Sequence, residues 1–97
     1  MGGYEIRLTP HFEKMLSKLP HDIRRRVLEG CEVLVSNPLV GKPMKGSYEV
    51  RIDDGVFRIS LRSLRVGDYR VLYWVDHLRK VVWLLFVGHR SGVYKLI

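Results

Sequence analysis

Residues 69–76 read YRVLYWVD and residues 81–87 read VVWLLFV, and these two stretches decide the fold. In the first, large apolar side chains recur at positions 69, 71, 73 and 75, which is the two-residue period of a β-strand. The second is apolar at every position, which is typical of a central strand that is buried on both faces. Asp76 and His77 lie between them as a turn. The C-terminal half therefore predicts neighbouring strands of an antiparallel sheet.

Two more strands are predicted upstream of this pair. Residues 48–53 and 57–62 alternate apolar and polar side chains, and Asp53-Asp54-Gly55 between them is a hairpin turn signal. Because side chains on a strand alternate between its faces, Arg58 and Arg62 are expected on one face of the strand 57–62. The preceding residues, 38–47, form a connecting loop rich in Gly, Pro and Lys.

The N-terminal half predicts one strand and two amphipathic helices. Residues 4–8 alternate as a short strand, and Thr9-Pro10 provides an N-cap and a first helical residue. Pro20 ends this helix and begins the next, which ends at Asn37-Pro38. We therefore expect a single α+β domain over residues 1–97, with the order β-α-α-β-β-β-β and the helical hairpin packed on one face of an antiparallel-rich sheet.

The charge of the chain favours a polyanionic partner. Lys and Arg number 17 against 10 Asp and Glu, a formal net charge of +7, and residues 45–97 carry ten of the basic and five of the acidic side chains. Neutralising phosphates releases counterions, so a small basic domain favours nucleic acid. Cys31 is the only cysteine, which excludes an intramolecular disulfide. Since the apolar run at residues 81–87 is too short to span a bilayer and no signal peptide is evident, we expect a cytoplasmic protein with no membrane partner.

The constellations of common enzymes are not evident in the sequence. The four histidines are scattered, no glycine-rich phosphate loop occurs, and neither a metal nor a cofactor is expected. Arginines on polar strand positions can instead converge on the open face of the sheet and bind phosphate through their planar guanidinium groups, with Trp74, Trp83 and Tyr94 available to stack on unpaired bases. Alternatively, the same arginines pair with Glu49, Asp53 or Asp68 and only stabilise the sheet.

A family resemblance rests on the stretch VGDYRVLY at residues 66–73, the apolar strand 81–87, and Gly88-His89-Arg90 with Tyr94 four residues later. Together with the N-terminal strand, the helical hairpin broken at Leu19-Pro20 and the basic loop, this pattern resembles the RelE/ParE toxin superfamily, above all its archaeal RelE-like members. The similarity extends over nearly the whole chain, and residues 66–94 carry most of its specificity.

The resemblance implies a toxin that cuts messenger RNA without a metal. In RelE-type toxins the ribosome presents a codon whose ribose 2′-OH attacks the adjacent phosphate, and the toxin orients the attack, stabilises negative charge and transfers protons. By the same resemblance, Arg70 and Arg90 match the phosphate-stabilising arginines. Tyr94 matches a C-terminal tyrosine that stacks on the nucleotide or helps to move a proton. The resemblance also implies an acidic antitoxin partner and a toxin–antitoxin hetero-oligomer.

The match is imperfect before Gly67, where bacterial members carry two lysines on a strand. One alignment puts Arg58 and Ser60 at the lysine positions; the other, without a gap, puts Arg65 beside the turn and makes residues 48–57 an insertion. Both stay open, and an arginine is a poor general base. The predicted catalytic residues are Arg58, Arg70, Arg90 and Tyr94, and the predicted RNA-binding residues are Lys42, Lys45, Arg62, Arg65 and His89.

Two alternatives to the nuclease remain. A ParE-like toxin shares the fold but inhibits DNA gyrase, because fold alone does not fix function. A non-catalytic RNA- or ribosome-binding module uses the same cations only for affinity. Retention of Arg70, Arg90 and Tyr94 together favours the nuclease.

Overall fold

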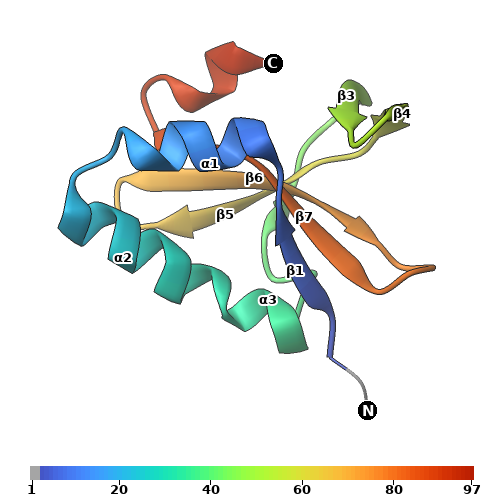
Figure 1. The fold of residues 1–97 in the computed structure, drawn as a ribbon, viewed down its shortest axis with the longest axis horizontal. Helices are drawn as coiled ribbons and strands as arrows, with labels where there is room; N and C mark the ends of the chain where they lie inside the picture. Colours follow the sequence, from blue (N-terminus) through green and yellow to red (C-terminus); the bar gives the residue numbers. More distant parts are fainter. Residues whose placement is uncertain (1–2) are drawn as a thin grey trace.

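A five-stranded mixed sheet forms the centre of the molecule, in a computed structural model that describes residues 3–97 (Figure 1). The strand order is β1-β7-β6-β5-β2. The pairing is antiparallel throughout except for β1, which runs parallel to β7. The strands are β1 Glu5–Leu8, β2 Lys42–Pro43, β5 Arg62–Val66, β6 Tyr69–Asp76 and β7 Val81–His89.

The predicted central strand is confirmed as β7, which lies between β1 and β6. Its apolar run is explained by burial on both faces, since Val82 packs in the core under the helices and Leu85 in the core on the other side. The turn before it is closed by Asp76, whose carboxylate accepts a hydrogen bond from the Arg79 backbone N–H at 3.1 Å. This hydrogen bond, more than any other contact, lowers the pKa of Asp76.

Three helices cover one face of the sheet. Thr9 is the predicted N-cap, with its Oγ1 accepting from the Phe12 N–H at 3.1 Å, and Pro10 is the first helical residue. The predicted second helix begins after Pro20 as expected, and Glu32 separates it into two segments. The helices are α1 Pro10–Ser17, α2 His21–Cys31 and α3 Val33–Ser36.

The core beneath the helices joins Phe12, Val27 and Leu34 to Val71 and Tyr73 of β6. All five side chains are fully buried. Burial of this kind supplies most of the stability of a small domain, at roughly 25 cal/mol per Å² of apolar surface. Cys31 belongs to the same core, and burial raises the pKa of its thiol to about 12, so it packs as a neutral apolar group.

The opposite face is partly covered by two smaller elements. Figure 1 shows the β3–β4 hairpin and the 3₁₀ helix η1 on the side of the sheet away from α2 and α3. The hairpin (β3 Tyr48–Ile52, β4 Gly55–Ile59) forms a two-stranded sheet of its own, and η1 spans Val93–Leu96. The second core lies under the hairpin and contains Val50, Ile52, Ile59, Leu61 and Leu85.

The structure corrects one prediction about the strands. Residues 57–62 are not one strand: β4 ends at Ile59, and β5 begins at Arg62 in the main sheet. The expectation that Arg58 and Arg62 share one face of a strand is therefore wrong. The chain passes from hairpin to sheet at Leu61, which is 1% exposed and whose carbonyl accepts from the Met44 N–H at 2.9 Å. Apolar and polar residues alternate through this passage without a Gly or Pro to mark it.

The α+β class is confirmed, with the N-terminal strand, the helices on one face and the antiparallel-rich sheet as predicted. Short strand β2, which pairs with β5, forms within the region expected to be a loop. Over residues 3–97, none of the helices is long and apolar enough to cross a lipid bilayer.

Candidate functional site

The register of β5 and β6 builds the site on the face opposite the helices. Leu64 packs in the core under the helices, so its neighbours Ser63 and Arg65 point to the other face. Arg65 stands directly opposite Arg70 of β6. Two arginines therefore project from this face at directly opposed cross-strand positions, where like charges repel.

Tyr94 reaches the same face from the C-terminal segment. Val93, 1% exposed, packs over Gly88, where an added Cβ would lie 3.4 Å from the Val93 Cβ. This contact holds η1 above β7 and lets Tyr94 extend across the sheet to Ser63. The Tyr94 Oη and Ser63 Oγ atoms lie 2.8 Å apart, and either can donate the hydrogen bond. The phenol is thus positioned on the face that carries Arg65 and Arg70, while 42% of the residue stays exposed.

Arg70 and Arg90 meet at the turn between β5 and β6. Gly67 adopts a positive φ of 59° there, which glycine accepts without strain. The Arg70 Nη1 donates to the carbonyls of Gly67 at 3.0 Å and Tyr69 at 2.9 Å, so the turn orients this side chain. The Arg90 backbone N–H donates to the Asp68 carbonyl at 2.8 Å, and its Nε lies 3.7 Å from the Asp68 carboxylate.

Lys42 also belongs to this face, because β2 places it opposite Ser63. Lys45 is exposed in the segment that follows, where its carbonyl accepts from the Tyr48 hydroxyl at 3.0 Å. His89 lies elsewhere: it is paired with Tyr69, and the two rings make an edge contact at 5.5 Å on the face toward the helices. Its Nδ1 accepts from the Ser91 backbone N–H at 3.1 Å.

Arg58 and Arg62 do not join the site. Arg62 is paired with the buried Tyr73 and so lies on the helix-side face, where its Nη1 donates to the carbonyls of Leu39 at 3.2 Å and Gly41 at 2.7 Å. Arg58 lies on β4 of the separate hairpin, and its Nη1 donates to the Ser47 hydroxyl at 3.3 Å.

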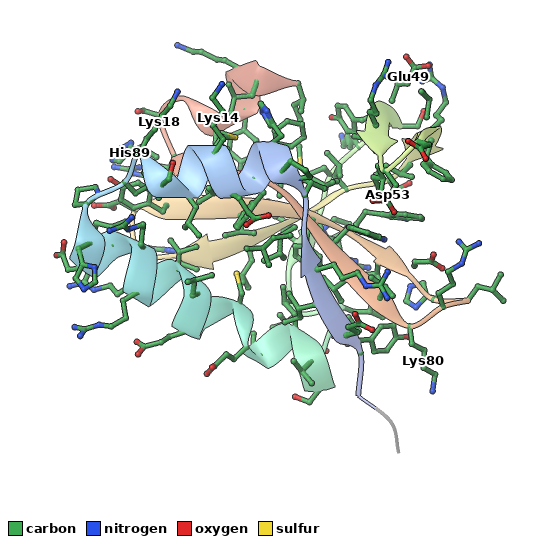
Figure 2. All side chains as sticks on the ribbon, in the orientation of Figure 1. Lys14, Lys18, Glu49, Asp53, Lys80 and His89 are labelled. Atoms are coloured by element: carbon green, nitrogen blue, oxygen red, sulfur yellow. The ribbon has the colours of Figure 1, made fainter. Side chains whose placement is uncertain are left out.

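The arginines of the site are largely free of carboxylates. Among the ion pairs within residues 3–97, only Arg90–Asp68 involves Arg65, Arg70 or Arg90. Figure 2 shows Glu49 and Asp53 on the hairpin side of the molecule, away from the end of the sheet that carries His89. The described part of the chain contains no group of three or more His, Cys, Asp or Glu side chains that could hold a metal ion. The face can therefore stabilise negative charge through guanidinium groups and exchange protons through hydroxyl groups.

Comparison with known proteins identifies the family. The profile of the ParE toxin of type II toxin–antitoxin systems, parDE, matches residues 6–94. The chain belongs to this toxin family. Toxin RelG of Mycobacterium tuberculosis is 35% identical over 94 residues, covering 95% of this chain and 97% of that one.

Two solved structures agree with the fold and with the RelE/ParE superfamily. The toxin–antitoxin complex RelBE2 from Mycobacterium tuberculosis contains a chain 34% identical to this toxin, with a TM-score of 0.70 and coverage of 91% of this chain and 99% of that one. The archaeal RelE–RelB complex from Pyrococcus horikoshii gives 28% identity, a TM-score of 0.67 and coverage of 94% and 99%.

The structure of the toxin favours one of the two alignments left open by the sequence. The strand that precedes Gly67 is β5, which carries Ser63 and Arg65 on the open face, whereas residues 48–59 form a hairpin outside the main sheet. This arrangement agrees with the alignment in which Arg65 lies beside the turn and residues 48–57 are extra. Ser63 was missed as a site residue. The sequence feature that could have indicated Ser63 is its position two residues before Arg65, which places both side chains on one face of a strand next to Arg70.

Proposed function

We propose that this toxin is a ribosome-dependent, metal-independent endoribonuclease that cleaves messenger RNA. In the reaction, the 2′-oxygen of a ribose forms a bond to the adjacent phosphorus while the bond from phosphorus to the 5′-oxygen breaks. The 2′-OH loses its proton to a base and the departing 5′-oxygen gains one, leaving a cyclic phosphate and a free 5′-OH. The phosphorus passes through a state with additional negative charge on its oxygens, which cations nearby stabilise.

One observation carries this proposal: Tyr94 is hydrogen-bonded to Ser63 on the face where Arg65 and Arg70 stand opposite each other. Arg70 and Arg90 would bind the phosphate oxygens, and Arg65 and Lys42 would contribute positive potential from the same end of the sheet. Tyr94 would stack on a nucleotide or exchange a proton through its hydroxyl, with Ser63 as its hydrogen-bonding partner. The site therefore has groups for charge stabilisation and for proton transfer.

Neither His89 nor Lys45 is placed to act as the general base of this reaction. His89 faces the helices together with Tyr69, and Lys45 is on the segment that follows β2, so neither stands next to Arg70. Ser63, Tyr94 and Lys42 carry exchangeable protons on the same face as Arg65 and Arg70. We propose that the ribosome-held codon approaches the toxin with its reacting ribose at this group.

An acidic antitoxin is the second proposed partner. The related RelBE2 and archaeal RelE–RelB toxins were solved as toxin–antitoxin complexes. The net charge of +7 would steer an acidic polypeptide to this toxin and favour a hetero-oligomer. Of the four residues of η1 only Val93 is buried, so an antitoxin segment can displace the rest of η1, including Tyr94, at small cost. Such displacement would remove the phenol from the site.

A gyrase inhibitor is the second candidate function, and the matching family profile favours it, because that profile describes ParE toxins. Such a toxin would bind DNA gyrase through its surface and would need no hydroxyl or guanidinium group aligned with a ribose. The two candidates therefore differ in their dependence on Tyr94 and on the arginines beside it.

The deciding experiment maps messenger RNA cleavage by primer extension in a translating extract, with wild type beside Arg90→Ala. We expect cuts within ribosome-positioned codons, and a roughly 10²- to 10³-fold slower reaction in Arg90→Ala. A DNA supercoiling assay with purified gyrase is run in parallel. Inhibited supercoiling without messenger cleavage would replace the nuclease with the gyrase inhibitor, and a folded protein inactive in both assays would leave a binding module.

A further inference from the structure

A second basic cavity lies where the hairpin joins the sheet, and it contains the two predicted site arginines that the candidate site leaves out. Its volume is about 490 Å³. Arg58 and Arg62 line it together with Ser60, Trp74 and His77, and the remaining lining residues are apolar. Arg62 and Ser63 are adjacent on β5 and point to opposite faces, so this cavity is distinct from the surface around Tyr94.

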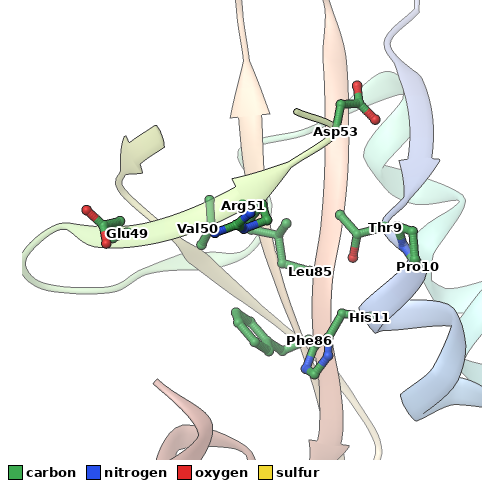
Figure 3. A pocket seen from close by; sticks show the side chains of 9 residues that line it. All are labelled: Thr9, Pro10, His11, Glu49, Val50, Arg51, Asp53, Leu85 and Phe86. Carbon is green, nitrogen blue, oxygen red and sulfur yellow. The ribbon is translucent and has the colours of Figure 1, made fainter. Parts of the chain in front are cut away.

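The charge in this cavity has one sign. None of its lining residues is acidic, whereas two are arginines and one is a histidine. A cavity of similar size, about 460 Å³, lies on the other side of the hairpin between β3, β7 and the start of α1 (Figure 3). There Arg51 is accompanied by Glu49 and Asp53, above an apolar floor that includes Leu85 and Phe86. Of these two cavities, the one at Arg58 and Arg62 has no acidic lining residue, and the nearest carboxylate in the strand register is Glu49, the cross-strand partner of Arg58.

Arg62 is held in place before any ligand arrives. Its Nη1 donates to two backbone carbonyls, which fixes the guanidinium plane and leaves the Nε and Nη2 donors for another acceptor. A planar donor pair of this kind matches two oxygens of a phosphate. Arg58 is more loosely held, with one hydrogen bond to Ser47 at 3.3 Å. The pair thus combines an oriented cation with an adjustable one.

Trp74 supplies an aromatic surface next to these cations. One face of its indole stacks on Phe57, with ring centroids 6.1 Å apart and planes at 28°. Phe57 lines a smaller cavity of about 250 Å³ on that side and is not part of the basic cavity, whereas Trp74 borders both. The indole therefore borders both cavities, and Phe57 covers one of its faces. Aromatic rings in this setting stack on unpaired bases of any sequence.

We propose that this cavity binds a nucleotide of single-stranded RNA, with the phosphate at Arg58 and Arg62 and the base against Trp74. This second site rests on the proposed RNA-directed function and extends it, because it would hold a part of the RNA away from the reacting phosphate. The hairpin makes the site, since it contributes Arg58 and places Phe57 against one face of the indole. Affinity would come from charge and stacking rather than from base-edge recognition.

The test is an NMR titration of the full chain with an oligouridylate whose riboses are 2′-O-methylated. Such an RNA lacks the attacking hydroxyl, and no ribosome is present, so binding is measured independently of cleavage. The chain has two tryptophans, and their indole N–H signals are assigned with Trp83→Phe. Trp83 is the cross-strand neighbour of Trp74 but does not line the basic cavity. Trp83 already has the Arg7 guanidinium 5.6 Å from its ring centre. We expect the Trp74 signal to shift in a saturable, salt-sensitive manner and the Trp83 signal to move far less.

The matched variants are Arg58→Gln and Arg51→Gln, which remove one exposed charge each from the same hairpin. We expect Arg58→Gln to weaken the binding seen at Trp74 about tenfold, and Arg51→Gln to leave it nearly unchanged. An unshifted Trp74 signal, or equal weakening by both variants, would overturn the site. Tighter binding of a glutamate-rich peptide than of the RNA, measured from the same Trp74 signal, would also overturn the site. If messenger cleavage is absent but Trp74 responds as expected, the proposed nuclease fails and this site stands.

Discussion

Tyr73 and Tyr94 lie on opposite faces of the same sheet, and they show how the toxin separates stability from chemistry. Tyr73 is fully buried, and its hydroxyl donates to the Pro38 carbonyl at 2.7 Å and accepts from the Gly41 N–H at 2.9 Å. Tyr94 is 42% exposed, and its hydroxyl has one protein partner, Ser63. The tyrosine hydroxyl is therefore satisfied by hydrogen bonds within the fold on one face, and it stays accessible to a ligand on the other.

The surroundings of the two phenols explain this difference. Burial is the main cause that raises the pKa of Tyr73, because the charged form would lose its hydration in the core. Its two hydrogen bonds join β6 to the loop after α3, so Tyr73 closes the end of the helix-side core. Tyr94 instead lies on a short C-terminal element over a face with Arg65 and Arg70. Complete burial with satisfied hydrogen bonds identifies a structural tyrosine, and partial exposure beside cations identifies a candidate for chemistry.

Of the two tyrosines, Tyr94 is expected to give the larger effect when it is replaced, and on activity alone. Because base stacking on an aromatic ring contributes about 1–3 kcal/mol, Tyr94→Ala should slow ribosome-dependent cleavage by roughly 5- to 150-fold. The melting temperature should change little, since the side chain is outside both cores. Tyr94→Phe keeps the ring, and its remaining deficit measures the contribution of the hydroxyl. Cleavage by Tyr94→Ala at the wild-type rate would remove Tyr94 from the proposed site.

Tyr73→Phe tests the other half of the comparison. The substitution leaves the Gly41 N–H without its buried partner and frees the Pro38 carbonyl, which should lower the free energy of unfolding by about 1–3 kcal/mol. Urea denaturation followed by circular dichroism measures this loss. Cleavage per folded molecule should stay the same. A Tyr73→Phe protein with wild-type stability would contradict the structural role, and one that is stable but inactive would reverse the assignment of the two tyrosines.

The helix-side core was predictable because its signals are local. Thr9-Pro10 marks the start of α1, Pro20 marks the start of α2, and the apolar run of β7 has one structural explanation, burial on both faces. The alternation on β6 likewise identified which side chains face the core. These features are set by backbone geometry within a few residues.

The open face was harder to predict because it depends on which strands pair. Arg58 and Arg62 have strand spacing in the sequence, but the chain leaves the hairpin at Leu61, and this separates them onto two sheets. The Ser63–Tyr94 hydrogen bond joins residues 31 positions apart, so no local pattern could reveal it. Strand position and residue type made Arg70, Arg90 and Tyr94 candidates for binding phosphate and bases, and the family resemblance supplied their expected roles. Local spacing identified the residue types of the site, and tertiary pairing selected its members.

The smallest predicted effect concerns Arg65. It tests whether the neighbouring cations of the open face lower the stability of the fold. Arg65 and Arg70 are directly opposed across two strands, an arrangement in which like charges destabilise a sheet. Arg65→Gln should therefore raise the free energy of unfolding by roughly 0.2–1 kcal/mol at low salt, and the gain should shrink as salt screens the repulsion. Cleavage should fall in the same variant because the positive potential at the phosphate falls.

Arg25→Gln, at an exposed position of α2, removes the same charge far from this pair and is the control. A gain in stability that is equal in both variants would reflect the net charge of the chain alone. A loss of stability in Arg65→Gln would mean that the arginine packs favourably on the strand, and the site would then not be held at a cost to the fold.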